Sequence, residues 1–535
     1  MIKNLSSLIT AVGLCAALAL PVRLTAQDQK EKNEHHHYEL IDMGTFGGPS
    51  SLFSNPDSRV VNNRGTAAGW ADTSIPDPGC FLDCLVNHAF VWKNGVTTEL
   101  GALPGGLSSL ALGVNNRGLI VGQSQNASID PLTGAPEVRA VLWRKGQIVD
   151  LGTLGGNAST SISINDRGQV LGAATNATFD PFANASQGAC LVLPTNNPCS
   201  GSTFVFNSIF SPTTTETRAF VWQDGFIRDL GTLGGPDSAP EINNDRGEVT
   251  GWSYTSFVAN PSTGTPNVDP FLWSPEDGKM TDLGSLGGTF GAPFWLNNRG
   301  HVVGASNLAG DQTFHPFLWD SGKLHDLGTL GGYTGVAFMV NDAGEAVGYA
   351  DLAPNPIGCA GLSCIHHGFL WKDGVMTDLG TLSDPCSRAL SINEDGQIVG
   401  VTSPCGGEFT RAFLWENGGP IVDLNSLIVN GSGLVVREGD FINDRGEIAG
   451  RAVLPNGDVH AVLLIPCDED HAEVEGCDGD TIEAQTAAQV RPAQANQSTA
   501  AGNTAKLFPA EMKSRFNSMM TDRNHLFSRP QPLPK

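Results

Sequence analysis

The sequence predicts an all-β fold, an eight-bladed β-propeller whose blades are four-stranded antiparallel sheets. Three short motifs recur eight times each and always in the same order, which is typical of repeat architectures. Glycine makes up 65 of the 535 residues and charged residues only 16%, a balance that favours tightly turned β-structure over helices. The two ends of the repeated region also carry strand-like segments that complete each other, which indicates a closed ring.

The three motifs mark corresponding places in every repeat. The first is Asp-Leu-Gly or a close variant, and its copies begin at Asp42, Glu99, Asp150, Asp229, Asp282, Asp326, Asp378 and Asp423. The second is an N-x-x-G turn with Asn, Asp or Glu in second place, and it begins at Asn62, Asn115, Asn165, Asn244, Asn297, Asn341, Asn393 and Asn443. The third is an Ala-Phe-Val-Trp type of strand that ends at Trp92, Trp143, Trp222, Trp273, Trp319, Trp371 and Trp415; its eighth copy, residues 460–465, has no Trp.

One repeat shows how these motifs become four strands. Residues 388–393, 397–402, 411–415 and 420–424 are apolar and extended, and we name the corresponding strands of every repeat a, b, c and d. The N-x-x-G turn joins a to b with its glycine in a left-handed conformation, and an Asx-Gly pair such as Asn94-Gly95 joins c to d. Each repeat is therefore an antiparallel meander, and eight meanders predict a propeller.

The ends of the repeated region favour closure. Residues 38–44 form a strand d with no a, b or c before it, and residues 460–466 form a strand c with no d after it. Pairing of these two segments would complete the last blade and cover a sheet edge. An open β-solenoid gives no reason for this complementarity; the solenoid and two separate propellers are the alternatives.

The glycine-rich segment DLGTLGG, at residues 150–156 and in three near-copies, crosses from strand d to strand a of the next blade. A phosphate-binding loop would need a following helix and usually a lysine, and neither is present. We therefore expect its glycines to serve tight backbone geometry between blades.

The chain divides into four parts. Residues 1–26 resemble a signal peptide, because Lys3 precedes a 13-residue apolar run at 8–20 and small residues follow near Ala26. A short membrane anchor is the alternative, although the run is shorter than the roughly 20 residues that a spanning helix needs. Residues 27–37 form a polar lead-in, residues 38–466 the propeller, and residues 467–535 an acidic, then low-complexity tail that we expect to be mostly disordered.

Ten cysteines remain once Cys15 of the signal peptide is set aside. They fall in close pairs, Cys80/Cys84, Cys190/Cys199, Cys359/Cys364, Cys386/Cys405 and Cys467/Cys477. An even number after an export signal predicts disulfides in an oxidising compartment, either extracellular or periplasmic. A metal site is the alternative, but the spacings are irregular.

The net charge of −24 disfavours nucleic acid and anionic membranes as partners, since both require positive charge on the protein. We expect no cofactor. The acidic clusters at residues 468–470 and 478–480 are candidates only for weak calcium binding, because the ligand pattern of a known calcium loop is missing. His35, His36 and His37 could bind a metal, but we favour a solvated lead-in.

The motifs His88-Ala-Phe, NDRGQVLG (165–172) and DLGTLGG resemble the HAF-repeat family of extracellular bacterial repeat proteins. The resemblance covers residues 38–466. The His-Ala-Phe triplet of the family is not kept in every repeat. Arg218 and Arg411 stand in place of the histidine, and Gly368, after His367, stands in place of the alanine. The resemblance implies export and a repeat fold, and it implies no reaction and no catalytic residues.

Antiparallel order places the short a–b and c–d turns on one face and the b–c and d–a loops on the other. The b–c loops vary widely in length and contain three of the cysteine pairs, while Cys386/Cys405 would tie the start of a strand a to the loop after b. Variable, cross-linked loops on a rigid ring are typical of a binding face, although surface loops also tolerate neutral insertions.

Six loop acids are candidates for chemistry: Asp130, Asp180, Asp237, Asp269, Asp311 and Asp384. Two of them could form a glycosidase pair, but three precede proline, which indicates turn formation, and no pair stands out as catalytic. The sequence thus predicts a non-enzymatic module that binds a carbohydrate, a cell-surface component or a protein through its b–c loops. The alternatives are a polysaccharide hydrolase or lyase and a purely structural envelope protein.

Overall fold

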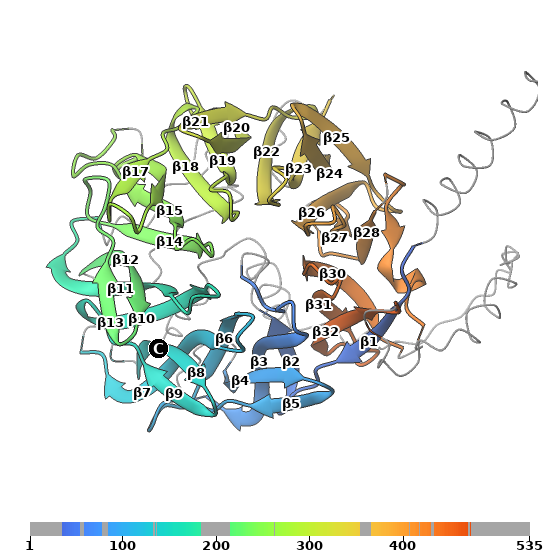
Figure 1. The fold of residues 1–535 in the computed structure, drawn as a ribbon, viewed down its shortest axis with the longest axis horizontal. Helices are drawn as coiled ribbons and strands as arrows, with labels where there is room; N and C mark the ends of the chain where they lie inside the picture. Colours follow the sequence, from blue (N-terminus) through green and yellow to red (C-terminus); the bar gives the residue numbers. More distant parts are fainter. Residues whose placement is uncertain are drawn as a thin grey trace, which may run out of the picture.

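A computed structural model describes residues 35–471 except 54–57, 78–83, 132–133, 135, 183–214, 262, 354–364, 406, 417, 430–432 and 469–470. The predicted signal peptide, the tail from residue 472 onwards, and Cys80, Cys190, Cys199, Cys359, Cys364 and Cys477 lie outside the described residues. The described residues form an all-β fold of four-stranded antiparallel sheets that lie side by side around a common centre (Figure 1).

The strands follow the repeats. The first four repeats contain β2 (Gly47–Phe53), β3 (Thr66–Pro76), β4 (Leu85–Lys93) and β5 (Val96–Glu99); β6 (Ser109–Val114), β7 (Ile120–Ile129), β8 (Pro136–Arg144) and β9 (Gln147–Asp150); β10 (Gly155–Ile164), β11 (Val170–Phe179), β12 (Thr215–Gln223) and β13 (Phe226–Asp229); and β14 (Ser238–Asn243), β15 (Val249–Tyr254), β16 (Val268–Trp273) and β17 (Met280–Asp282).

The next three repeats contain β18 (Gly287–Leu296), β19 (Val302–Leu308), β20 (Phe314–Asp320) and β21 (Lys323–Asp326); β22 (Gly331–Val340), β23 (Ala346–Leu352), β24 (His366–Lys372) and β25 (Val375–Gly380); and β26 (Cys386–Ile392), β27 (Ile398–Ser403), β28 (Arg411–Trp415) and β29 (Val422–Asp423), followed by the 3-10 helix η2 (Leu424–Ser426). The last sheet joins β30 (Val435–Ile442), β31 (Ile448–Val453) and β32 (Val459–Pro466) to β1 (Tyr38–Asp42). No α-helix occurs among the described residues.

The first strand of the chain pairs with the last. β1 lies antiparallel to β32, with Tyr38 opposite Pro466 and Asp42 opposite Val462, and Figure 1 shows the two strands side by side. The side chain of Tyr38 is fully buried there, and its backbone N–H donates to the carbonyl oxygen of Leu427. β1 thereby covers the edge of β32, as the complementary ends predicted.

The turns have the conformations that their sequences predict. In the N-x-x-G turn at Asn393, Gly396 has a φ of 78°. In the c–d hairpin of the first repeat, Asn94 and Gly95 both have positive φ, at 49° and 79°, as a type I′ turn requires. In the d–a crossing of the third sheet, a Cβ on Gly156 would lie 2.2 Å from the side chain of Thr175, so close packing requires glycine.

Six of the eight sheets pack a phenylalanine of strand c on a glycine of strand b, and the other two have Val141 and Val462 at this place. Phe220 is fully buried and pairs in register with Gly172, and a Cβ on that glycine would lie 2.5 Å from the phenyl ring. Phe413 and Gly400 repeat the arrangement in another sheet. The apolar cores lie between neighbouring sheets, which explains why the strands are apolar nearly throughout. No helix in the described part of the chain is long and apolar enough to cross a membrane.

Candidate functional site

The asparagine that opens each N-x-x-G turn links neighbouring sheets. Within its own turn, Asn115 accepts hydrogen bonds from the backbone N–H groups of Arg117 and Leu119. Its Nδ2 then donates to the backbone oxygen of Asn165, the equivalent residue of the next repeat. The series runs from Asn62 through Asn115, Asn165, Asn244, Asn297, Asn341, Asn393 and Asn443 back to Asn62, with distances of 2.7–3.2 Å.

The residue after each asparagine forms a second series. Its side-chain oxygen accepts from the backbone N–H of the equivalent residue in the preceding repeat. The members are Asn63, Asn116, Asp166, Asp245, Asn298, Asp342, Glu394 and Asp444, and the series returns from Asp444 to Asn63, with distances of 2.8–3.3 Å. We call these eight residues the rim.

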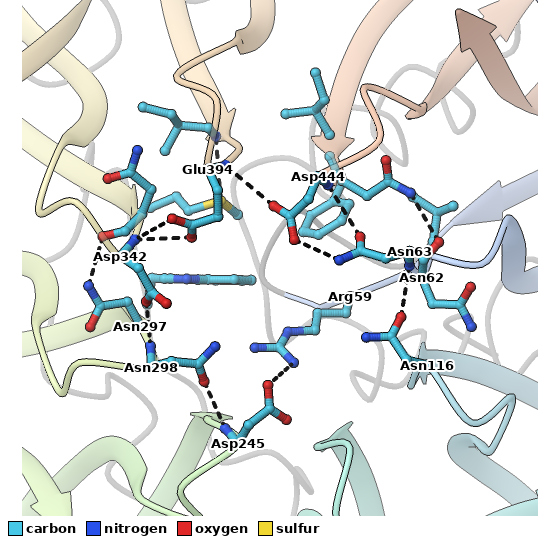
Figure 2. A pocket seen from close by; sticks show the side chains of 18 of the residues that line it. Arg59, Asn62, Asn63, Asn116, Asp245, Asn297, Asn298, Asp342, Glu394 and Asp444 are labelled. Atoms are coloured by element: carbon cyan, nitrogen blue, oxygen red, sulfur yellow. Dashed lines mark hydrogen bonds and ion pairs between the residues drawn. The ribbon is translucent and has the colours of Figure 1, made fainter. Parts of the chain in front are cut away.

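The rim surrounds a pocket of about 130 Å³ where the inner ends of the sheets meet (Figure 2). Its apolar lining comes from the ends of the innermost strands and includes Trp295, Met339, Ile392 and Phe441. The rings of Trp295 and Phe441 lie 6.3 Å apart, although they belong to β18 and β30. Apolar walls beneath a few convergent polar groups are typical of a ligand site.

The rim carries more negative than positive charge. Five of its eight side chains are carboxylates, namely Asp166, Asp245, Asp342, Glu394 and Asp444. Burial raises the pKa of Glu394, and the neighbouring charges of Asp342 and Asp444 add to that effect. Arg59 lines the same pocket, and its Nη1 lies 3.4 Å from Oδ2 of Asp245 (Figure 2).

The opposite face, with the b–c loops, holds ionisable pairs. The histidine of the His-Ala-Phe motif faces the aspartate of the Asp-Leu-Gly motif on the adjacent strand. Nδ1 of His315 lies 2.9 Å from Asp326, and Nδ1 of His460 lies 2.8 Å from Asp42. Burial opposes ionisation of both aspartates, but hydrogen bonds from the histidine and a backbone N–H leave the pKa of each below its usual value.

The fourth repeat replaces this histidine with a second acid. Asp269 stands two residues before Phe271, which pairs with Asp282. His315 has the equivalent position, two residues before Phe317, which pairs with Asp326. Asp269 thus lies in β16, and its assignment to a loop was wrong. Burial raises the pKa of Asp269 to about 7, and the charge of Asp282 adds to that effect.

Two of the six candidate acids come together. Burial raises the pKa of Asp237 to about 7, with a further contribution from the charge of Asp180. Asp237 accepts a 2.7 Å hydrogen bond from the backbone N–H of Thr217, and Asp180 accepts one of 2.8 Å from Phe182, the turn that its Asp-Pro sequence predicted. Among the described residues, these are the two of the six acids for which the charge of one raises the pKa of the other.

The other acids make local contacts. Asp311 accepts from the backbone N–H of Thr289, Asp130 from the side chain of Asn157, and Asp384 contacts the hydroxyl of Thr410. Each of these bonds ties a loop to a neighbouring strand or turn.

The histidines of the lead-in are not simply solvated, contrary to the prediction. Nδ1 of His35 and Nδ1 of His36 lie 3.2 Å and 3.0 Å from the carboxylate of Glu416, which the backbone N–H of His36 also contacts. Burial opposes ionisation of Glu416, but the hydrogen bond with His36 and others lower its pKa to about 2. The buried Glu416 attracts these residues, and its position in another repeat hid the contact from sequence analysis.

Cys386 and Cys405 form a disulfide, as predicted, with their Cα atoms 5.2 Å apart. Cys84 also takes part in a disulfide, and so does Cys467. Of the predicted calcium-binding acids, Asp468 is described and lies 2.6 Å from Nδ1 of His471. Within the described ranges, no group of three or more His, Cys, Asp or Glu residues is arranged to hold a metal ion.

Comparisons with known proteins assign this chain to no family. No protein-family model matches this chain, and no curated protein matches it. Matching solved structures include an acylaminoacyl peptidase of Pyrococcus horikoshii (9% identity, TM-score 0.36, 75% of this chain and 57% of the peptidase), TolB of Acinetobacter baumannii (13%, 0.28, 65% and 79%) and a polysaccharide lyase of family PL25, an ulvan lyase (9%, 0.32, 65% and 90%). Likeness at these TM-scores carries no argument about fold or function.

Sequence analysis assigned the N-x-x-G residues to turns and did not predict the pocket. A signal was present, because the second residue is Asn, Asp or Glu in all eight copies. An N-x-x-G turn alone does not require such a side chain. Because the second side chain can accept a hydrogen bond in every repeat, it indicated a partner outside the turn.

Proposed function

We propose that this chain is an exported, non-enzymatic binding module, an eight-bladed propeller closed by β1, that holds a carbohydrate ligand in the pocket inside the rim. The pairing of β1 with β32 and the two returning series of turn hydrogen bonds support a closed ring. The recurring motifs support membership of the HAF-repeat family. The Cys386–Cys405 disulfide supports export, because disulfides persist in oxidising compartments.

The pocket inside the rim carries the proposal. Two series of interblade hydrogen bonds hold its polar groups in place before any ligand arrives, which lowers the entropic cost of binding. Trp295 and Phe441 offer aromatic surface that packs against the C–H face of a sugar ring. This choice moves the binding site from the b–c loops to the face with the short turns.

A binding screen tests the proposal. The purified full-length chain is presented to a glycan array and to insoluble polysaccharides, and every hit is examined for cleavage products. We expect binding without cleavage, and we expect Trp295→Ala to abolish it. Phe226→Ala is the matched control, because Phe226 is an aromatic residue that is 80% exposed on the outer strand β13. Equal binding by both variants would exclude the pocket as the site.

The acid pair on the loop face favours a second candidate, a polysaccharide hydrolase or lyase. A carboxyl with a pKa of about 7, as in Asp237, is suited to donate or accept a proton at neutral pH. This candidate predicts cleavage products that Asp237→Asn eliminates. If neither binding nor cleavage is found with any glycan or protein, a structural role in the envelope replaces both candidates.

A further inference from the structure

The side chains of the rim fall into two arcs that differ in their hydrogen bonding. On one arc the side chains bond to each other. Asn63 Nδ2 donates to Oδ2 of Asp444 at 2.6 Å, and Asn116 Nδ2 donates to Oδ2 of Asp166 at 2.7 Å. These four residues therefore have little capacity left for a ligand.

The other arc leaves polar groups unused (Figure 2). Asn298 Oδ1 and Asp342 Oδ1 accept backbone N–H groups, but Asn298 Nδ2 and Asp342 Oδ2 make no hydrogen bond within the described part of the chain. The indole N–H of Trp295 likewise has no partner among the described residues, although that side chain is only 7% exposed. Trp295 lines the pocket, so its N–H is available to donate a hydrogen bond to a ligand there.

Arg59 pairs with a second acid of this arc, Asp245. In the first repeat, Asn62 of the turn comes fourteen residues after Gly48, the last glycine of the d–a crossing. In the sixth repeat, the equivalent Asn341 comes only nine residues after Gly332, so the first repeat has a longer segment before its turn. Arg59 lies in this longer segment and reaches Asp245 of the fourth repeat. Its charge offsets that of Asp245. Both carboxylate oxygens of Glu394 accept from the backbone N–H of Asp342, so Oδ2 of Asp342 is the carboxylate oxygen of this arc that a ligand can use.

From these unused groups we infer that the ligand is a neutral glycan whose adjacent hydroxyls bind Asn298, Asp342 and Trp295. This inference rests on the proposed function and names the class of sugar. Asn298 Nδ2 and the Trp295 N–H need acceptors, whereas Oδ2 of Asp342 needs a donor. A hydroxyl is both donor and acceptor, so a pair of hydroxyls satisfies all three groups.

Other ligand classes satisfy the arc less well. An ammonium group offers donors only and would give neither N–H group an acceptor. A uronic acid or a sulfated sugar offers acceptors, but the five carboxylates of the rim repel its charge. The apolar walls favour the C–H face of an uncharged ring over a fully solvated ion.

The test is calorimetric titration with three matched oligosaccharides that are neutral, amine-bearing and uronic. Wild-type protein is expected to bind the neutral sugar at least tenfold more tightly than either charged one. We expect Asp342→Asn, on the unused arc, to weaken neutral-sugar binding about tenfold, as loss of a charge-assisted hydrogen bond implies. Asp373→Asn, in an exposed c–d turn of the same repeat and outside the pocket, is the matched control and should change affinity less than twofold.

The outcomes separate the inference from the proposed function. Preference for a charged sugar, or equal effects of Asp342→Asn and Asp373→Asn, would overturn the inference while leaving a sugar-binding pocket. If no glycan binds, or if Trp295→Ala binds normally, the proposed function fails as well. Salt dependence of the wild-type protein also distinguishes the neutral from the amine-bearing oligosaccharide. The affinity for the neutral sugar should not change with salt concentration, whereas the affinity for the amine-bearing sugar should fall as salt rises.

Discussion

The two faces of this molecule are held together by different chemistry. On the face with the short turns, neighbouring sheets are joined by hydrogen bonds between amide groups, such as Asn244 Nδ2 to the backbone oxygen of Asn297 at 2.9 Å. On the face with the b–c loops, adjacent strands are joined by ionisable pairs such as His315 and Asp326. The difference teaches that the asparagine series between the sheets contains no titratable side chain, whereas the pairs on the loop face contain aspartates with a shifted pKa, such as Asp326.

The same comparison separates structure from function. The turn face repeats one bonding pattern eight times, and its pocket stands out because a few polar atoms are left over. The loop face varies from repeat to repeat, with His315 in one sheet and Asp269 at the equivalent place in another. Repetition therefore locates the framework, and the departures from it locate the candidate sites.

The largest effect is expected where the first strand meets the last. Tyr38→Ala removes a fully buried aromatic side chain from β1 and should lower the free energy of unfolding by about 3–5 kcal/mol. Urea denaturation followed by circular dichroism measures this loss. A change below about 0.5 kcal/mol, the size expected for a surface substitution such as Phe226→Ala, would contradict the account of the closing strand.

The framework of the turn face gives the next effect. Asn115→Ala removes the acceptor for the N–H groups of Arg117 and Leu119 and the donor to the backbone oxygen of Asn165, in a buried position. We expect a loss of about 2–3 kcal/mol that is the same across the neutral and mildly acidic pH range. A loss that varies strongly with pH would show that charges, not amides, hold this face.

A pH-dependent effect is expected for Asp269 on the loop face. Its pKa is about 7 in the folded protein and near 3.8 when unfolded, so the folded state binds more protons between these values and its stability falls as pH rises through that window. At about pH 8, Asp269→Asn should be more stable than wild type by about 1–2 kcal/mol, and the gain should disappear near pH 4. Thermal unfolding at both pH values measures it, and a gain that persists at low pH would exclude this explanation.

The smallest effect, of opposite sign, belongs to Asp326. Its folded pKa lies below 3.8, so its contribution to stability is present above the unfolded pKa and is lost as pH falls through the folded value. Because the pair is partly exposed, Asp326→Asn should cost only about 0.5 kcal/mol at neutral pH and less in acid. An unchanged cost at low pH would contradict the pairing with His315.

Much of the fold could be predicted from the sequence because the decisive signals are local. The turn at Asn393–Gly396 and the hairpin at Asn94-Gly95 are specified by residues that tolerate positive φ. The pairing of β1 with β32 followed from counting the strands of each repeat, and the Cys386–Cys405 disulfide followed from parity and spacing.

The candidate site could not be predicted, because it depends on which atoms remain unbonded after the repeats assemble. Asn116 and Asn298 occupy equivalent places, yet only Asn116 finds an aspartate for its Nδ2. The contact between His36 and Glu416 joins residues far apart in sequence, so no local pattern reveals it. Burial by neighbouring sheets likewise determines the pKa of Asp237, and it acts through space.

Hydrogen–deuterium exchange with and without a glycan identified in the screen tests the central claim most directly. The account predicts slower exchange in the turns at residues 297–300 and 341–344, beside Trp295 and Asp342, and no change in the b–c loops. Protection confined to the b–c loops around Asp180 and Asp237, with the turns unchanged, would contradict it and move the site to the opposite face.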